Sequence, residues 1–284
     1  MTTTLTLAIA ERSAIHAPLP DESDPSTLVW VDYAGTPSAY FYRAGDEYWA
    51  YLPVVGAFRS GPDGEVLAVP NEGVSDELVV DTYRRTIAPM TLQLLGRQVL
   101  HASAIESPDG VIGFCADSQT GKSTIAFGLA GRGYRVCADD ALAFDTSGPS
   151  GVRMHELPFS VRLRPASAAY FDVPVPPAPI LDAEGRITVG GDGLPLAALC
   201  ILSRQEEGRG VELRRLAADE VIRMLLPHAY CFTLLEDELK RKTVAEYLEL
   251  AGRVPVYEVR FTASLDELPL LLSEVERVLI REAA

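Results

Sequence analysis

The sequence predicts an α/β protein in which a small antiparallel β module precedes a larger domain of alternating strands and helices. Short strand-like runs separated by Gly, Pro and Asp turns fill residues 1–72. From about residue 97 onward, apolar runs of strand length alternate with helical patterns, which is typical of a sheet covered by helices. We therefore expect a β-rich module with a linking helix over residues 1–95 and an α/β domain over residues 96–284.

The expected strands of the module are short and rich in aromatic residues, which favour the half-buried faces of a sheet. Ser75 is placed to cap a helix that runs to about Leu95. Pro89 should kink or divide this helix, because proline has no amide hydrogen for the helical ladder. The five strands expected before the helix are Leu5–Ala10, Leu28–Asp32, Ala39–Arg43, Tyr48–Leu52 and Val66–Val69.

One stretch of the larger domain has the pattern of a phosphate-binding loop. An apolar run, Val111–Cys115, predicts a buried strand, and an amphipathic segment closed by Gly131 and Gly133 predicts a short helix. The connection between them fits the loop pattern, with alanine in place of the first glycine. Its nine residues are Ala116, Asp117, Ser118, Gln119, Thr120, Gly121, Lys122, Ser123 and Thr124.

Each part of this loop has a chemical reason. A loop that enters a helix N-terminus presents backbone N–H groups and the positive end of the helix dipole to an anion. The amine of Lys122 would reach the β- and γ-phosphates of a nucleotide, and the Ser123 hydroxyl would bind Mg²⁺. The sequence therefore predicts a site for ATP and Mg²⁺ over residues 116–124.

Two carboxylates follow the next expected strand. The run from Tyr134 to Ala138 ends in Asp139 and Asp140, and in open α/β sheets ligands bind beyond the carboxyl ends of the strands. One carboxylate can hold Mg²⁺ while the other accepts a proton from an incoming hydroxyl. Successive residues of a strand point to opposite sides, so the two are not expected to share one role.

These features together resemble the catalytic domain of HPr kinase/phosphorylase, whose nucleotide-binding loop is similar to that of phosphoenolpyruvate carboxykinase. The resemblance covers residues 97–145 and includes the His101 stretch, the loop and the two aspartates, and Val254–Val259 is also similar. It implies a P-loop kinase core that transfers the γ-phosphoryl group of ATP to a protein serine. It also implies that Asp140 is the general base and that His101 lies close to the reacting phosphate. With Asp140 as the base, we expect Asp139 mainly to serve the metal.

The chain departs from the family pattern at several positions. The first and middle glycines of the family's loop are Ala116 and Gln119 here, and its glutamate after the metal-binding serine is Thr124. The signature of the reverse, phosphorolytic reaction is not recognisable after Met154, so we expect transfer in the forward direction only. The chain is similar to a divergent branch found with ribosomally made peptides, and HPr itself is not the expected substrate.

The region after residue 145 is read from shorter patterns. Val161–Pro165 is interpreted as a short strand that places Arg162 and Arg164 on one face, either near the phosphates or at an exposed edge. Residues 181–192 are interpreted as a loop over the site, with Arg186 as a candidate phosphate contact. Later expected elements are strands at Leu196–Leu202, Val211–Arg214 (beside the preceding strand) and Val254–Val259, and helices at Ala217–Leu226, Glu236–Leu250 and Ser264–Ile280.

Composition excludes several classes of partner. The net charge is −15 and only three lysines occur, so the chain lacks the dense basic surface that nucleic acids require. Four scattered cysteines predict buried thiols rather than disulfides or a zinc site. The N-terminus has no basic leader and no apolar run approaches the roughly 20 residues that span a membrane, which predicts a cytoplasmic protein with no membrane partner. Whether it forms a homo-oligomer is left open.

Three functions fit this sequence. The first is an ATP- and Mg²⁺-dependent kinase of a serine or other hydroxyl in a protein or peptide, and the second is a kinase of a small hydroxylated metabolite. The third is a nonenzymatic nucleotide sensor, because Ala116 and Gln119 stiffen the loop and disfavour a positive φ. The residues alone do not separate the first two, and the resemblance favours the first.

Overall fold

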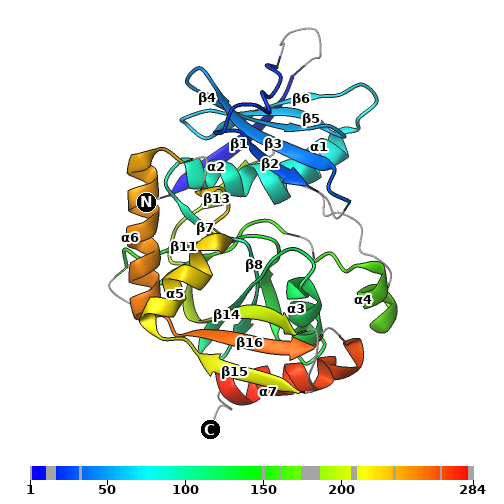
Figure 1. The fold of residues 1–284 in the computed structure, drawn as a ribbon, viewed down its shortest axis with the longest axis vertical. Helices are drawn as coiled ribbons and strands as arrows, with labels where there is room; N and C mark the ends of the chain where they lie inside the picture. Colours follow the sequence, from blue (N-terminus) through cyan, green and yellow to red (C-terminus); the bar gives the residue numbers. More distant parts are fainter. Residues whose placement is uncertain are drawn as a thin grey trace. The chain divides into compact units, whose positions relative to one another are not determined.

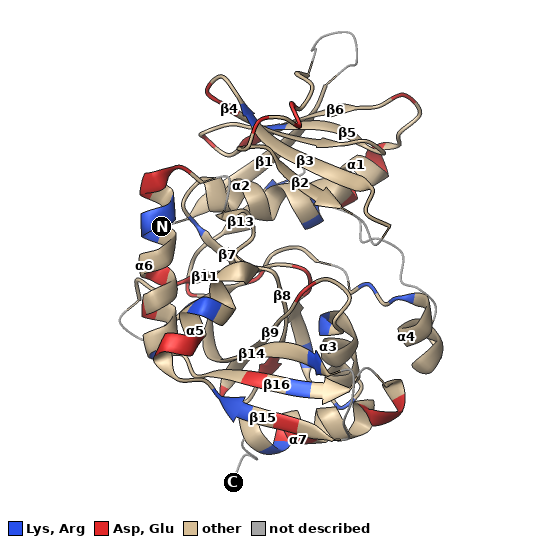
Figure 2. Ribbon diagram, in the orientation of Figure 1, with Lys and Arg blue, Asp and Glu red and all other residues tan. Residues whose placement is uncertain are grey.

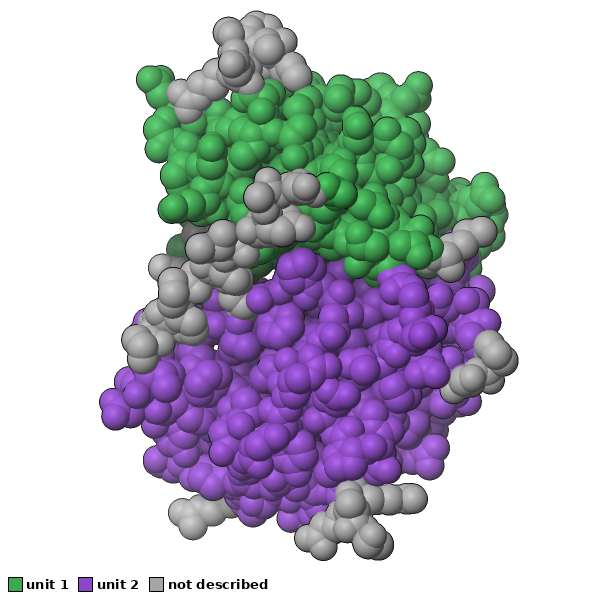
Figure 3. All heavy atoms as spheres, turned by 180° about the vertical axis from the view of Figure 1, so that it is seen from behind, with its two compact units in different colours: residues 1–97, 179–189, 231–241 green, residues 98–178, 190–230, 242–284 purple. Residues whose placement is uncertain are grey.

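A computed structural model gives the fold of the protein in two compact units (Figure 3). One unit holds residues 1–97 together with residues 179–189 and 231–241, and the other holds residues 98–178, 190–230 and 242–284. The first unit therefore takes in two segments from late in the chain, besides the module expected over residues 1–95. The structure describes residues 2–10, 17–31, 34–148, 151–159, 161–173, 186–205, 210–232, 235–262 and 264–280.

The first unit contains a seven-stranded sheet with the order β13-β1-β6-β5-β4-β3-β2 (Figure 1). The strand β5 was not expected from the sequence. All neighbours are antiparallel except β1 and β6, so the expectation of a purely antiparallel module is wrong. The strands are β1 (Thr3–Ile9), β2 (Leu28–Val31), β3 (Pro37–Ala44), β4 (Glu47–Leu52), β5 (Gly56–Ser60), β6 (Glu65–Pro70) and β13 (Arg186–Val189).

The strand β13 corrects the interpretation of residues 181–192 as a loop. Residues 186–189 pair antiparallel with β1, with Arg186 opposite Thr6. Ile187 and Val189 are buried while Arg186 and Thr188 are exposed, which is the two-residue period of a strand. The glycines that follow this run had suggested a loop. Residues 181–185 lie outside the described residues.

The linking helix forms as predicted and is widened rather than broken at proline. Helix α1 (Asp76–Thr82) begins at Ser75, whose hydroxyl accepts a hydrogen bond from the amide of Leu78. A π-helical turn, Tyr83–Ile87, then leads into α2 (Ala88–Leu94). The wide turn ends two residues before Pro89, and it contains the residue whose carbonyl the proline ring would otherwise meet, four residues before the proline.

The second unit is built on a mixed sheet of nine strands. Seven of them follow the order β10-β8-β9-β14-β12-β11-β7, and the remaining two branch from it, because β16 also pairs with β14 and β15 pairs with β16. Parallel pairs join β9 to β14 and β14 to β16, and the other pairs are antiparallel. The strands are β7 (Gln98–Leu100), β8 (Ala102–Ser107), β9 (Gly110–Cys115), β10 (Arg135–Ala138), β11 (Leu142–Asp145), β12 (Arg153–His155), β14 (Leu194–Gln205), β15 (Val211–Arg215) and β16 (Val256–Thr262).

Helices cover both faces of this sheet. On one face, α3 (Lys122–Ala130) and α7 (Leu268–Leu279) pack against β8, β9, β14 and β16. On the other face, α5 (Ala218–Leu225) and α6 (Asp237–Arg253) close a second core with residues of β11 and β12. Every residue of β9 is buried between these layers, which explains why its sequence is a continuous apolar run.

Three expected strands of this unit need correction. The run expected over Gln98–Ile105 divides at His101 into β7 and β8. The strand β15 does not lie beside β14, because β16 is inserted between them. Residues 161–164 form no regular element, and Pro165 begins the short helix α4 (Pro165–Tyr170), since its fixed φ suits the first helical position.

Two expectations from composition can be compared with the structure. All four cysteines are buried free thiols, as the sequence predicts. Burial raises the pKa of the Cys115 and Cys137 thiols to about 12, so both remain protonated near neutral pH. Within the described ranges, no helix is both long enough and apolar enough to cross a bilayer.

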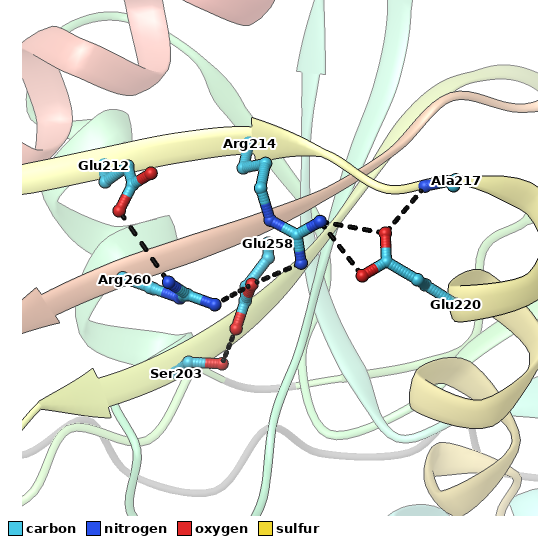
Figure 4. A network of polar contacts seen from close by, with 7 residues as sticks. All are labelled: Ser203, Glu212, Arg214, Ala217, Glu220, Glu258 and Arg260. Carbon is cyan, nitrogen blue, oxygen red and sulfur yellow. Dashed lines mark hydrogen bonds and ion pairs between the residues drawn. The ribbon is translucent and has the colours of Figure 1, made fainter.

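Charged residues on β15 and β16 form a network on the sheet (Figure 2, Figure 4). The carboxylate of Glu258 accepts hydrogen bonds from Arg214 at 2.9 Å and from Ser203 at 3.2 Å, and it pairs with Arg260 at 2.9 Å. Its side chain is 9% exposed, whereas that of Glu212, 3.9 Å from Arg260, is 62% exposed. The hydrogen bonds and ion pairs of Glu258 lower its pKa against the effect of burial.

Replacing Glu258 by glutamine should lower the free energy of unfolding by about 1 kcal/mol, because charge-assisted bonds become neutral ones in a partly screened network. Urea unfolding measures this difference. Glu212→Gln is the matched control on the neighbouring strand, and its stability should equal that of the parent within error. Equal stabilities of the two variants would contradict the prediction.

Candidate functional site

Strand directions in the second unit bring the predicted site residues to one edge of the sheet. The strand β8 is antiparallel to both β9 and β10, so β9 and β10 run in the same direction. Both end at the edge where β8 begins: Cys115 lies opposite Ala102, and Ala138 lies opposite Ala104. The loop after β9, the carboxylates after β10 and His101 before β8 therefore meet there.

The loop between β9 and α3 contains two residues with positive φ, Gln119 and Gly121. Gly121 caps α3 with φ of 120°, a conformation that favours glycine. Gln119 has φ of 72°, so the glutamine adopts the left-handed conformation that glycine accepts more readily. Ala116 is not among the described residues with positive φ. Of the two replaced glycines, only the one at position 119 carries a conformational penalty.

Lys122 is buried beneath this loop. The side chain is only 6% exposed, and its Nζ donates hydrogen bonds to the main-chain oxygens of Ala116 at 2.8 Å and Asp117 at 3.3 Å. Burial lowers the pKa of Lys122, and the negative charge of Asp140 is the largest effect that opposes this. The amine is thus held against main-chain oxygens at the start of the loop.

Asp139 connects the loop helix to the sheet. The residue is 5% exposed, and its Oδ1 accepts hydrogen bonds from Ser123 at 2.7 Å and from Ser103 at 2.6 Å. Its Oδ2 accepts a bond from the main-chain N–H of Arg162 at 3.1 Å. Burial, followed by the charge of Asp140, raises the pKa of Asp139, and these three bonds oppose the shift. The Ser123–Asp139 contact joins the two residues expected to hold a metal.

Asp140 has an unusual, left-handed backbone conformation. Its φ is 66°, in the left-handed region, and β10 already ends at Ala138. The alternation of side chains along a strand therefore does not apply to the two aspartates, which follow the strand. The main-chain oxygen of Asp140 lies 3.0 Å from Nδ1 of His101.

His101 is a neutral imidazole with a defined tautomer. Burial, and next the positive charge of Lys122, lowers the pKa of His101 to about 4. Because a carbonyl oxygen only accepts, Nδ1 carries the proton in its bond to Asp140, and Nε2 keeps its lone pair. The amide of His101 donates to the main-chain oxygen of His228 at 2.8 Å, which fixes the break between β7 and β8.

Other contacts complete the surroundings of the loop. Arg164 donates to the Gln119 side chain at 2.9 Å, so it does lie beside the loop as one of its two interpretations allowed. Arg204 donates to the main-chain oxygen of Thr120 at 3.2 Å. Thr124, which stands where the resemblance has glutamate, lies 2.9 Å from the hydroxyl of Ser167, a buried residue of α4.

Sequence reasoning missed four residues of this site, namely Ser103, Ser167, Arg204 and His228. Ser103 is two residues after His101, and a two-residue period would have placed them on the same side of one strand. His228 is 8% exposed, and its pKa is lowered by burial while the charge of Asp117 opposes that shift. No motif surrounds it in the sequence.

The donor set fits a nucleotide and its metal. A buried lysine, the N-terminus of a nine-residue helix and a hydroxyl–carboxylate pair supply the groups that phosphates and Mg²⁺ require. No group of three or more His, Cys, Asp or Glu suited to a metal occurs in the part of the chain that the structure describes. Mg²⁺ commonly uses only one or two protein ligands beside phosphate oxygens and water, so Ser123 and Asp139 are sufficient for it.

Comparisons with known proteins add little to this geometry. No family model and no curated protein matches the chain. A solved structure described as the Hpr(Ser) kinase/phosphatase from Coxiella burnetii matches with 14% identity and a TM-score of 0.33, over 63% of this chain and 88% of that chain. A similarity this slight identifies neither a family nor an activity.

The lowered pKa of His101 predicts how the stability of the protein depends on pH. Between pH 6.5, its usual pKa, and about 4, its folded pKa, the unfolded chain binds a proton that the folded chain does not. The free energy of unfolding should therefore fall as the pH is lowered through this window, and His101→Asn should reduce that fall. The measurement is urea unfolding between pH 4 and 7, with an NMR titration of the His101 ring. An imidazolium at His101 above pH 6 would contradict the prediction.

Proposed function

We propose that the protein binds ATP with Mg²⁺ and transfers the γ-phosphoryl group to a hydroxyl, most readily a serine, of a protein or peptide. The observation that carries this proposal is the 2.7 Å bond between Ser123 and Asp139, beside the buried Lys122 at the start of α3. A helix that merely began with Gly-Lys-Ser would need neither a buried lysine nor a carboxylate from the next strand at its first turn.

In this proposal the loop Ala116–Thr124 holds the phosphates. Lys122 already lies at the inner side of the loop, where its amine contacts main-chain oxygens that a phosphate oxygen can replace as its partner. Ser123 and Asp139 would hold Mg²⁺, which supplies positive charge to the transferring phosphoryl group. Burial raises the pKa of Asp139, and a cation at this place would oppose that shift by favouring the charged carboxylate.

Asp140 is the proposed general base. Its left-handed backbone turns the residue away from the direction that β10 would give it, and its charge lies near Lys122 and His101. A carboxylate there can accept the proton of the attacking hydroxyl. His101 is neutral near pH 7 because its pKa is about 4, so its Nε2 can accept a hydrogen bond without adding positive charge.

Transfer from labelled ATP tests the proposal directly. The purified protein is incubated with γ-labelled ATP and Mg²⁺ together with cell extract, hydroxyl-bearing peptides and a panel of small metabolites. Label on a polypeptide supports the proposal. Label on a metabolite would assign the chain to the metabolite kinases, and ATP binding without any transfer would assign it to the nonenzymatic sensors.

Lys122→Ala should weaken ATP binding by about 10–100-fold, because a charged hydrogen bond to phosphate is lost. Isothermal calorimetry with Mg²⁺ present measures the affinity. Lys242→Ala, which removes the same charge from an exposed position of α6, is the control and should bind as the parent does. If the Lys122 variant bound ATP as tightly as the parent, the loop of residues 116–124 would not be the ATP site.

Asp140→Asn should lower the single-turnover rate of transfer by about 10²–10⁴-fold, the range of a general base. ATP affinity should change little, since the phosphates and the metal are held by other residues. Rapid-quench kinetics with the acceptor found in the labelling experiment gives the rate. A variant with the parent's rate would place the base elsewhere, with His101 as the next residue to test.

A further inference from the structure

Two serines from different elements share one oxygen of Asp139. Ser123 approaches from the first turn of α3 at 2.7 Å, and Ser103 approaches from β8 at 2.6 Å. Both hydroxyls donate to Oδ1, while Oδ2 accepts the main-chain N–H of Arg162. The carboxylate is therefore fixed from three directions by segments far apart in the sequence.

The two serines differ in what else they can reach. Ser123 is partly exposed and lies in the loop helix, so its oxygen is available to a metal or a phosphate. Ser103 has no exposed surface. A buried hydroxyl is unfavourable without a hydrogen bond. The Ser103 hydroxyl makes such a bond by donating to Asp139.

This arrangement separates two tasks. When a metal takes a lone pair of the Ser123 oxygen, the orientation of Asp139 still has to be maintained. Ser103 can maintain it, because its position in the sheet does not depend on the loop. Residues that orient a metal ligand through a hydrogen bond typically change metal affinity by 10–100-fold when they are replaced.

We propose that Ser103 is a positioning residue of the metal site, which holds the carboxylate of Asp139 in the orientation that binds Mg²⁺ with the nucleotide. The inference rests on the proposed function and concerns a residue to which neither the loop pattern nor the resemblance assigns a role. It requires that the loss of the Ser103 hydroxyl weaken the binding of Mg²⁺ and leave the binding of ATP by the phosphate loop unchanged.

Calorimetric titration of ATP over a series of Mg²⁺ concentrations and in excess EDTA tests this requirement. For Ser103→Ala, the Mg²⁺ concentration that gives half of the maximal gain in ATP affinity should rise about 10-fold or more. ATP affinity in EDTA should stay at the parent's value, a separation that a general loss of structure would not produce. Ser103→Cys keeps the size but donates weakly, so it should show the same direction of change if the alanine variant fails to fold.

Ser107→Ala is the matched control. Ser107 is a second buried serine of β8, and its hydroxyl donates to Gly110 at 2.7 Å at the far end of the strand. Its Mg²⁺ requirement should equal that of the parent. An unchanged requirement in the folded Ser103 variants, or an equal rise in the Ser107 variant, would overturn the inference alone. A parent protein whose ATP binding shows no dependence on Mg²⁺ would overturn the proposed function as well.

Discussion

The buried carboxylate of Asp139 is the constraint on which the arrangement of the site depends. A charge or polar group removed from water is unfavourable unless donors surround it. Here the donors come from β8, from the start of α3 and from the segment before α4, which are separated by 20 residues or more in the sequence. Each bond helps to satisfy the same carboxylate, so the bonds together set the spacing between the sheet and the loop helix. The position of the loop of residues 116–124 therefore depends on contacts with residues outside the loop.

The parts of this site that the sequence predicts are those with short-range causes. A continuous apolar run, a Gly-Lys-Ser step and an amphipathic segment lie within about 20 residues of one another, and β9, the loop and α3 form as expected. The convergence of Asp139 with Ser123 follows from the rule that parallel strands end at one edge. That rule holds even though β8 lies between β9 and β10. Because β8 is antiparallel to both of these strands, β9 and β10 run in the same direction.

The parts that were missed depend on contacts between distant residues. Nothing near Arg186 indicates that its segment pairs with β1, some 180 residues earlier, and its glycines suggested a loop instead. The alternation of Arg162, Leu163 and Arg164 imitated a strand, but the following proline begins a helix and the amide of Arg162 turns to Asp139. Ser103 looked like a small residue of an apolar strand, and only the carboxylate opposite it gives it a role.

Two residues of this site have a left-handed backbone conformation. Gln119, Asp140 and Asp172 are the non-glycine residues with positive φ in the described ranges, and two of them belong to this site. Such residues cost on the order of 1–2 kcal/mol each, and the surrounding structure has to hold them. Arg164 holds the Gln119 side chain, and His101 holds the main chain of Asp140. A loop kept only to sense a nucleotide would gain nothing from a strained aspartate beyond it, whereas a carboxylate aimed at an acceptor hydroxyl requires that its direction be fixed. In the proposed function, the left-handed backbone of Asp140 would fix the direction of the general base.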